Sequence, residues 1–189
     1  ADLLQAASWS VTDSLPYDST YLDGKFGAWL EGNAVVTPDG NVADLLRVDY
    51  APGPEYAALI RLRDSVSFDP FDPEKDFVRM PGGAKKFTVR YDSLSGRYWS
   101  LVNYVTQEWA GKQNPAWVRN TLALSSSPNL QEWTVHRTVL HHPDIAKHGF
   151  QYADWLFDGN DIVLLSRTAY DDNGTGAHNC HDANYMTFH

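Results

Sequence analysis

The sequence predicts an all-β protein, and three observations support that prediction. Helical periodicity is nearly absent, whereas short apolar or alternating runs recur between turn-forming residues. Pairs of such runs, joined by turns rich in Gly, Asp and Asn, recur about every 40 to 50 residues, which is typical of β-propeller blades. We expect about three to four blades in a single β-propeller-like domain covering residues 1–189. A β-sandwich is the alternative, because it has the same strand spacing.

Four β-hairpins account for most of the predicted strands. Each joins two apolar runs through a turn in which Gly supplies a positive φ or Asp, Asn and Ser bond the backbone. The expected pairs are 34–37 with 42–50, 86–91 with 97–103, 120–125 with 133–140, and 150–157 with 162–169. Residues 55–62 and 77–80 are expected to form further strands, and 104–118 a long polar loop of the kind that often holds binding groups.

Composition argues against two classes of partner. The formal net charge is −9 and the sequence has no basic cluster, so nucleic acid is not expected as a partner. No apolar run approaches the roughly 20 residues of a membrane helix, so no membrane partner is expected either. The single cysteine, Cys180, excludes an internal disulfide.

The two ends of the chain indicate a partial domain. The chain lacks an initiator Met, and its last residues, Tyr185–His189, read as the middle of a strand with no closing turn. We therefore expect the catalytic domain to be incomplete at its N-terminus and cut at its C-terminus.

Several segments resemble known proteins. Ser125–Trp133 is similar to the Ser-x-(Asp/Asn)-Leu-x-x-Trp blade turn of five-bladed glycosidases, itself reminiscent of the Asp-box of sialidases, where the role of the turn is structural. From Trp29 onward the chain resembles bacterial sialidase-like glycosyl hydrolases, in the segments Trp29–Asn33, Pro81–Phe87, Phe150–Trp155, Ser166–Asp172 and His178–Tyr185. The resemblance implies a secreted or periplasmic propeller glycosidase. We expect no cofactor.

Glycoside hydrolysis uses two carboxyl groups, one protonated and one ionised, across the bond that is cleaved. Asp154 is the expected acid, because the aromatic residues around it would desolvate it and raise its pKa. Glu31 or Asp171 is the expected base or nucleophile, and Glu31 precedes Gly32, where backbone can approach a ligand closely. For each carboxylate, a structural role in a turn is the alternative.

One stretch near the C-terminus has the highest density of ionisable residues. Arg167 precedes Asp171, and His178, His181 and Asp182 follow within a few residues. We expect His181 to hydrogen bond Asp182 and to orient it or shuttle a proton. A metal site is not expected here, because the neighbouring Cys and His would point apart on a strand.

Three arginines lie on or at the end of different predicted hairpins: Arg47, Arg119 and Arg167. In sialidases, three arginines from different blades hold the substrate carboxylate through bidentate hydrogen bonds. If these three converge, the substrate is an acidic sugar. The alternative is that each pairs with a nearby Asp, for example Arg47 with Asp44 or Asp49.

The sequence thus predicts a glycoside hydrolase that cleaves a carbohydrate by paired carboxyl catalysis, with an acidic sugar as the sialidase-like refinement. Four further side chains complete the expected sugar site: Trp29, Trp155, Tyr170 and His178. The alternative is a non-catalytic, lectin-like propeller, which needs no carboxyl pair. The sequence has no clear counterpart of the sialidase tyrosine nucleophile, although Tyr152, Tyr170 and Tyr185 are available.

Overall fold

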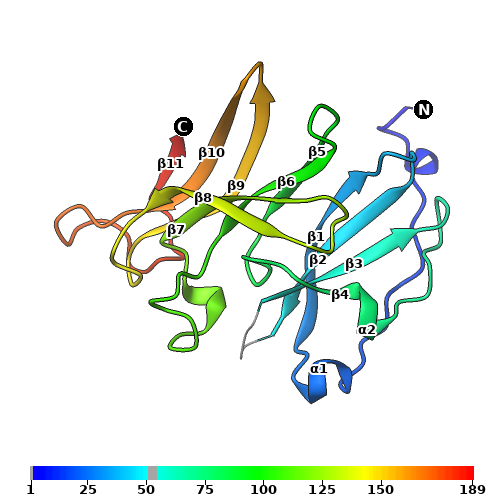
Figure 1. Ribbon diagram of the computed structural model, residues 1–189, viewed down its shortest axis with the longest axis horizontal. Coiled ribbons are helices and arrows are strands. Elements are labelled where there is room, and N and C mark those ends of the chain that lie inside the picture. Colours follow the sequence, from blue (N-terminus) through cyan, green and yellow to red (C-terminus); the bar gives the residue numbers. More distant parts are fainter. Residues whose placement is uncertain (1, 51–54) are drawn as a thin grey trace.

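The computed structural model describes residues 2–50 and 55–189, which form three antiparallel sheets (Figure 1). The first sheet contains β1 (Ala28–Val36), β2 (Val42–Asp49), β3 (Tyr56–Leu62) and β4 (Phe77–Arg79). The second contains β5 (Thr88–Asp92), β6 (Arg97–Asn103), β7 (Thr121–Ser127) and β8 (Thr134–His141). The third contains β9 (Gly149–Asp158), β10 (Asp161–Ala169) and β11 (Tyr185–Phe188). The helical turns are η1 (Ala6–Ser8), α1 (Tyr21–Gly24), α2 (Pro73–Asp76) and η2 (Pro115–Trp117).

Each sheet is a meander in which consecutive strands pair, and its first strand lies beside the first strand of the next sheet. Asn33 on β1 exchanges two hydrogen bonds with the backbone of Val89 on β5, at 3.1 and 3.3 Å. Thr88 on β5 donates its hydroxyl to the carbonyl oxygen of Ala153 on β9 at 3.1 Å. Successive meanders joined through their first strands are the arrangement of propeller blades. The fold is therefore all-β and corresponds to a partial propeller, as predicted.

Apolar side chains fill the spaces between successive sheets. The first and second sheets enclose a cluster that includes Leu45, Leu59, Met80, Phe87 and Val102. The second and third sheets enclose Leu101, Leu122, Ala153, Trp155 and Leu164. A third cluster covers the outer face of the first sheet with Phe26, Val48, Ala58 and Ile60. Each large side chain buried in this way stabilises the fold by roughly 1.5–3 kcal/mol, so the blades are held together by these layers.

The meander sorts the connections onto two ends of the blades. One end, called here the turn end, has the connections β1–β2, β3–β4, β5–β6, β7–β8 and β9–β10. The tips of β5–β6 and β9–β10 point the same way at the top of Figure 1. The opposite end, called here the loop end, has the connections β2–β3, β4–β5, β6–β7, β8–β9 and β10–β11. Polar side chains from all three blades meet at the loop end.

The first hairpin begins earlier than its sequence indicates. The predicted strand started at Ala34, whereas β1 starts at Ala28. A register shift between Trp29 and Gly32 interrupts the pairing with β2. Because a bulge breaks the alternation of apolar and polar residues, this part of the strand was not recognisable from the pattern.

The glycosidase-like turn has the structural role that the sequence predicted. Asn129 accepts hydrogen bonds from the backbone N–H groups of Gln131 and Glu132, at 3.0 and 2.9 Å. Trp133 donates its indole N–H to the carbonyl oxygen of Leu130 at 3.0 Å and packs on the first core cluster. The segment therefore closes the β7–β8 hairpin and contributes to the core.

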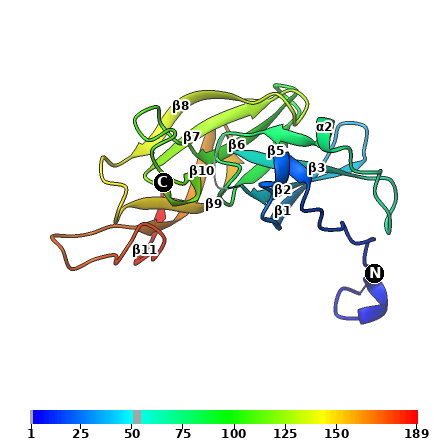
Figure 2. The same cartoon turned by 90° about the horizontal axis from the view of Figure 1, so that it is seen from below.

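The segment before β1 runs beside the first sheet and then extends away from it toward the N-terminus (Figure 2). Its rings of Tyr21 and Phe26 pack against the outer face of that sheet. In the described part of the chain, no helix has the length and apolar character needed to span a membrane.

Candidate functional site

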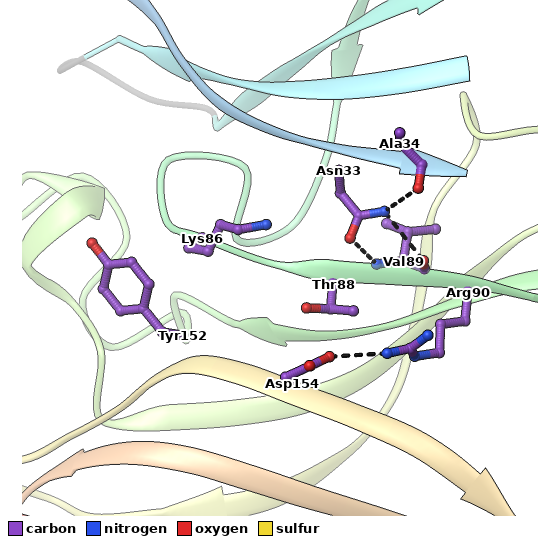
Figure 3. A pocket seen from close by; sticks show the side chains of 8 residues that line it. All are labelled: Asn33, Ala34, Lys86, Thr88, Val89, Arg90, Tyr152 and Asp154. Atoms are coloured by element: carbon purple, nitrogen blue, oxygen red, sulfur yellow. Dashed lines mark hydrogen bonds and ion pairs between the residues drawn. The ribbon is translucent and has the colours of Figure 1, made fainter. Parts of the chain in front are cut away.

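A polar pocket lies where the first strands of the three sheets meet (Figure 3). Its lining comes from β1, β5, β9 and the β4–β5 loop, with Asn33, Ala34, Lys86, Thr88, Val89, Arg90, Tyr152 and Asp154. The ammonium group of Lys86 donates to the carbonyl oxygens of Gly32 and Phe87, at 3.2 and 2.8 Å. Burial lowers the pKa of Lys86, and the carboxylates of Glu31, Asp44 and Asp154 act in the opposite direction. The ammonium group therefore lies among three carboxyl groups.

Glu31 forms an ion pair with Arg47 at the loop end. Its Oε1 lies 2.5 Å from Nη1 of Arg47, and its side chain is 41% exposed, whereas that of Arg47 is 10% exposed. Burial raises the pKa of Glu31, but its own backbone and Arg47 outweigh that effect, so the pKa is lowered overall. Glu31 is held as a carboxylate. The suggested pairing of Arg47 with Asp44 or Asp49 is wrong, because Arg47 binds Glu31 and the carbonyl oxygen of Ala84.

Asp154 lies at the pocket but not in the surroundings that the sequence predicted. Its side chain is 70% exposed and forms an ion pair with Arg90, at 3.1 Å. The expected desolvation is therefore wrong. The neighbouring aromatic residue Trp155 points into the core on the opposite face of the strand, because successive side chains alternate.

Asp44 is a pocket neighbour that the sequence did not single out as catalytic. It pairs in register with Ala34 of the pocket lining, and its carboxylate packs directly on Gly32, where a side chain would not fit. Burial raises its pKa, against the opposing effect of Lys86. One carboxylate oxygen, Oδ1, is buried without a hydrogen-bond partner in the described part of the chain. Asp44 is therefore a carboxyl group whose surroundings favour the protonated form.

The positive charges of all three arginines act on His181 at the loop end, where Arg167 binds the carbonyl oxygen of His181 directly and Arg119 is linked to it through Gln151. Burial lowers the pKa of His181, and the positive charges of Arg119, Arg167 and Arg47 lower it further. Arg47 comes from the first sheet, Arg119 from the loop before β7 in the second, and Arg167 from β10 in the third. The pKa of Arg119 is itself lowered by burial, with Arg47 and Arg167 contributing. Three guanidinium charges from three blades therefore act on one region, called here the arginine cluster (Arg47, Arg119 and Arg167).

Two members of the arginine cluster are held by neutral acceptors. Arg119 donates to the carbonyl oxygen of Ala116 at 2.8 Å and to the side chain of Gln151 at 3.0 Å. Arg167 donates to the carbonyl oxygen of His181 at 2.6 Å. Within residues 2–50 and 55–189, neither guanidinium forms an ion pair with a carboxylate. Arg119 is buried and Arg167 is half-buried, and because buried charges are normally paired, an anion would complete this arrangement.

Two buried side chains at the loop end, Gln151 and Lys85, were not predicted from the sequence as part of the site. Gln151, which is fully buried, donates its amide to the carbonyl oxygens of Cys180 and His181, at 2.8 and 2.9 Å. Lys85, also fully buried, forms an ion pair with Glu55. Burial lowers the pKa of Lys85, while Glu55 opposes that shift. Both side chains connect separate loops at the loop end. This role depends on the folded structure and has no sequence motif.

The expected cluster around Asp171 is divided in the structure. Asp171 binds Lys147 at 3.1 Å, and that contact, followed by the backbone N–H of Gly176, lowers its pKa. His178 is exposed. The expected hydrogen bond between His181 and Asp182 is not formed, because the closest nitrogen and oxygen lie 3.9 Å apart, and Asp182 instead accepts from Asn179 at 2.7 Å. Of this group, only Arg167 and His181 lie together at the arginine cluster.

The aromatic residues that were expected to line the sugar site pack against core residues or other rings. Trp155 is 2% exposed inside the second core cluster. Trp29 packs among other rings, stacking on Phe77 with ring centres 5.7 Å apart, and donates its indole N–H to Pro16. The prediction for Trp155 is wrong, because strand periodicity does not reveal which face is buried, whereas the role of the half-buried Trp29 stays a prediction. Tyr170, which is 39% exposed, packs edge-on against His148 with ring centres 4.8 Å apart.

A second group of potential metal ligands lies in the β8–β9 loop. One ligand atom each from His142, Asp144 and His148 lies within 4.8 Å of the others. Both nitrogens of His148 are already engaged, with Asp144 at 2.6 Å and with the backbone N–H of Asp171 at 3.2 Å. Asp144 also accepts from the backbone of Ala146 and Lys147. These hydrogen bonds close the loop.

The comparisons with known proteins agree with the fold. Neither a family model nor a curated protein matches this chain. Among solved structures, the chain is similar to an α-L-arabinanase from Penicillium chrysogenum complexed with arabinobiose, with 12% identity and a TM-score of 0.53. The match covers 90% of this chain and 51% of the arabinanase, so the chain spans about half the length of that structure. An α-L-arabinofuranosidase from Fusarium graminearum matches 79% of this chain and 42% of its own, with 10% identity and a TM-score of 0.48.

Proposed function

We propose that this chain forms part of a glycoside hydrolase that acts on a sugar bearing a carboxylate. The observation that carries the proposal is the arginine cluster, in which guanidinium groups from three blades converge and two of them have no ion-pair partner in the described residues. Guanidinium groups recognise carboxylates through paired hydrogen bonds. The similarity in fold to an arabinanase supports the hydrolase class. The arginines, and not that similarity, support the acidic sugar.

The carboxyl groups around Lys86 supply the two protonation states that glycosidases use. Glu31 is held ionised by Arg47, which suits a base or nucleophile. Asp44 has a raised pKa, which suits an acid. It does not line the pocket itself but pairs with Ala34, which does. Asp154 lines the pocket but is exposed and paired. We therefore propose Glu31 as the ionised group, with Asp44 or Asp154 as the acid.

Turnover of an oligosaccharide panel tests this proposal. Uronic-acid and sialic-acid oligosaccharides are incubated with the wild-type chain and with Glu31→Gln, Asp44→Asn and Asp154→Asn, and released sugar is measured. We expect Glu31→Gln to reduce turnover by at least about 100-fold, because general acid–base groups contribute on the order of 10²–10⁴. One of the two Asp variants should do the same, which identifies the acid.

Two controls make the result decisive. Glu132→Gln, a change in the exposed part of the β7–β8 turn, should leave turnover unchanged. Thermal melting of every variant separates lost chemistry from lost folding. If the wild-type chain releases no sugar from any acidic oligosaccharide that it binds, the hydrolase proposal is contradicted.

A non-catalytic carbohydrate-binding propeller is the second candidate, and one observation favours it. Asp154, the acid that the sequence predicted, is exposed and paired with Arg90 instead of lying among aromatic rings. This candidate predicts that the wild-type chain binds acidic oligosaccharides without cleaving them, and that Glu31→Gln binds them as well as the wild type.

A further inference from the structure

Tyr152 has a backbone conformation that its residue type disfavours. Its φ is +52°. This value lies in the left-handed region, which glycine adopts readily and in which a bulky residue is an outlier. Leu22, Asp23, Leu130 and Asn173 share a positive φ but lie in turns or short helical segments, whereas Tyr152 lies within β9. Strained backbone that persists inside a strand often marks a functional position.

The strain arises from a bulge in β9. Gln151 pairs with Arg167 and Asp154 pairs with Leu165, so β9 has one residue more than β10 between these two pairs. Bulges of this kind re-aim a side chain. Gln151 and Ala153 on either side of Tyr152 are buried, while the Tyr152 ring lines the pocket (Figure 3). The bulge thus places an aromatic ring at the edge of the site.

The ring of Tyr152 lies beneath a member of the arginine cluster. The Cζ atom of Arg167 lies 5.1 Å from the centre of the ring, within the range of a cation–π contact. Arg167 has one hydrogen bond, to the carbonyl oxygen of His181, and no carboxylate holds it in the described part of the chain. Its orientation therefore depends on the ring and on that carbonyl.

We infer that Tyr152 is a positioning residue: its strained backbone presents a ring that fixes Arg167 in the orientation needed to bind the ligand anion. The expected effect of Tyr152 on binding rests on the proposed acidic ligand. The orientation of Arg167 by the ring is a property of the free protein. It requires the ring and not the hydroxyl. The positive φ at Tyr152 further predicts that glycine relieves the strain at this position.

The strain is tested by comparing glycine with alanine at two positions of β9. In an ordinary strand, glycine is less stable than alanine, so Leu156→Gly should melt about 2 °C below Leu156→Ala. Leu156 is 51% exposed and lacks a positive φ. At Tyr152 both variants lose the ring, but only glycine tolerates the backbone. Tyr152→Gly should therefore melt above Tyr152→Ala, by about 2 °C.

The positioning is tested on Arg167 itself and needs no ligand. We expect the NMR signal of the Arg167 side-chain Nε–H group, assigned by its loss in Arg167→Lys, to keep its shift in Tyr152→Phe. In Tyr152→Ala it should move toward the position of a freely rotating arginine. D-glucuronate, added as the probe, should bind Tyr152→Ala at least tenfold more weakly than the wild type and bind Tyr152→Phe within about threefold of it.

The outcomes separate this inference from the proposed function. If Tyr152→Ala leaves the Arg167 signal unchanged, or if Tyr152→Gly melts below Tyr152→Ala, the positioning role is overturned. If the Arg167 signal responds as expected but the wild type does not bind glucuronate or any other acidic sugar, the positioning role stands and the acidic ligand is wrong.

Discussion

The two ends of the blades satisfy their polar groups in different ways. At the turn end, side-chain oxygens accept hydrogen bonds from the backbone a few residues away: Asp92 accepts from the N–H groups of Leu94 and Ser95, and Asn129 accepts from those of Gln131 and Glu132. At the loop end, hydrogen bonds join different blades, as in Arg119, which precedes β7, with Gln151 on β9. The turn end is therefore specified locally, and the loop end only once the three blades have assembled.

The difference also concerns charge. The turn end pairs its polar groups within each turn, whereas the loop end brings guanidinium groups together that have few carboxylate partners among the described residues. Placing like charges near one another costs stability, and an anionic ligand would offset that cost. We therefore expect changes at the turn end to alter stability alone and changes at the loop end to alter binding.

The largest effect is expected from the buried ion pair at the loop end. Lys85→Met leaves the Glu55 carboxylate, 9% exposed, without its partner. Removal of one partner of a buried pair costs about 3–5 kcal/mol, so the melting temperature should fall by roughly 10 °C. Differential scanning fluorimetry measures it. The double variant Lys85→Met, Glu55→Gln should recover much of the loss, and equal melting of the single variant and the wild type would contradict the pairing.

Loss of a guanidinium group from the arginine cluster should affect binding next. Arg167→Gln removes a charge that has no carboxylate partner in the described residues. Hydrogen bonds to charged groups contribute about 1.5–3 kcal/mol, so the Kd for an acidic oligosaccharide should rise roughly 10- to 100-fold. Isothermal titration calorimetry gives the value. The matched control is Arg137→Gln on β8, and an equal loss in both variants would indicate a general charge effect.

A change at the turn end should cost stability without affecting binding. Asn129→Ala removes the acceptor for two backbone N–H groups at the β7–β8 turn. A cap of this kind contributes about 1 kcal/mol, which corresponds to roughly 2–4 °C in melting temperature. Binding of acidic oligosaccharides should stay within error of the wild type. A binding loss larger than the stability change would show that the two ends are coupled.

The smallest effect is expected at Asp44, and it depends on pH. Burial raises its pKa, so the folded state prefers the protonated form and loses stability as pH rises through that raised value. Asp44→Asn mimics the neutral form and should stabilise the protein at pH 7, on the order of 1 kcal/mol after solvent screening. Near pH 4 the gain should shrink toward zero. An equal gain at both pH values would exclude titration of Asp44 as the cause.

The turn end could be predicted from the sequence, whereas much of the loop end could not. Turn residues act within a few positions, so the hairpins around Gly40, Gly96 and Gly159 were recognisable. The partner of Arg47 could not be predicted, because the bulge between Trp29 and Gly32 determines which side chain of β1 faces Arg47. Strand periodicity likewise could not tell that Trp155 faces the core while Asp154 faces the pocket. The strained backbone at Tyr152 leaves no signal in the residue types around it.

The grouping of the three arginines was predictable from the sequence, but their partners were not. Three arginines on three hairpins suggested convergence through the resemblance to sialidases, in which three arginines from different blades hold the substrate carboxylate. Their partners depend on loops whose conformations the sequence does not specify. Lys85 and Gln151, which are fully buried at the loop end, were missed for the same reason.

Equilibrium binding to matched sugars tests the central claim most directly. Uronic-acid and sialic-acid oligosaccharides are compared with their carboxyl-reduced counterparts by calorimetry, at low ionic strength and again with added salt. The arginine cluster predicts that the wild-type chain binds at least one carboxylated sugar tenfold or more tightly than its reduced counterpart. It also predicts that Arg167→Gln loses most of that difference. Equal affinity for the carboxylated and reduced forms throughout the panel would contradict an anion-binding site at the loop end.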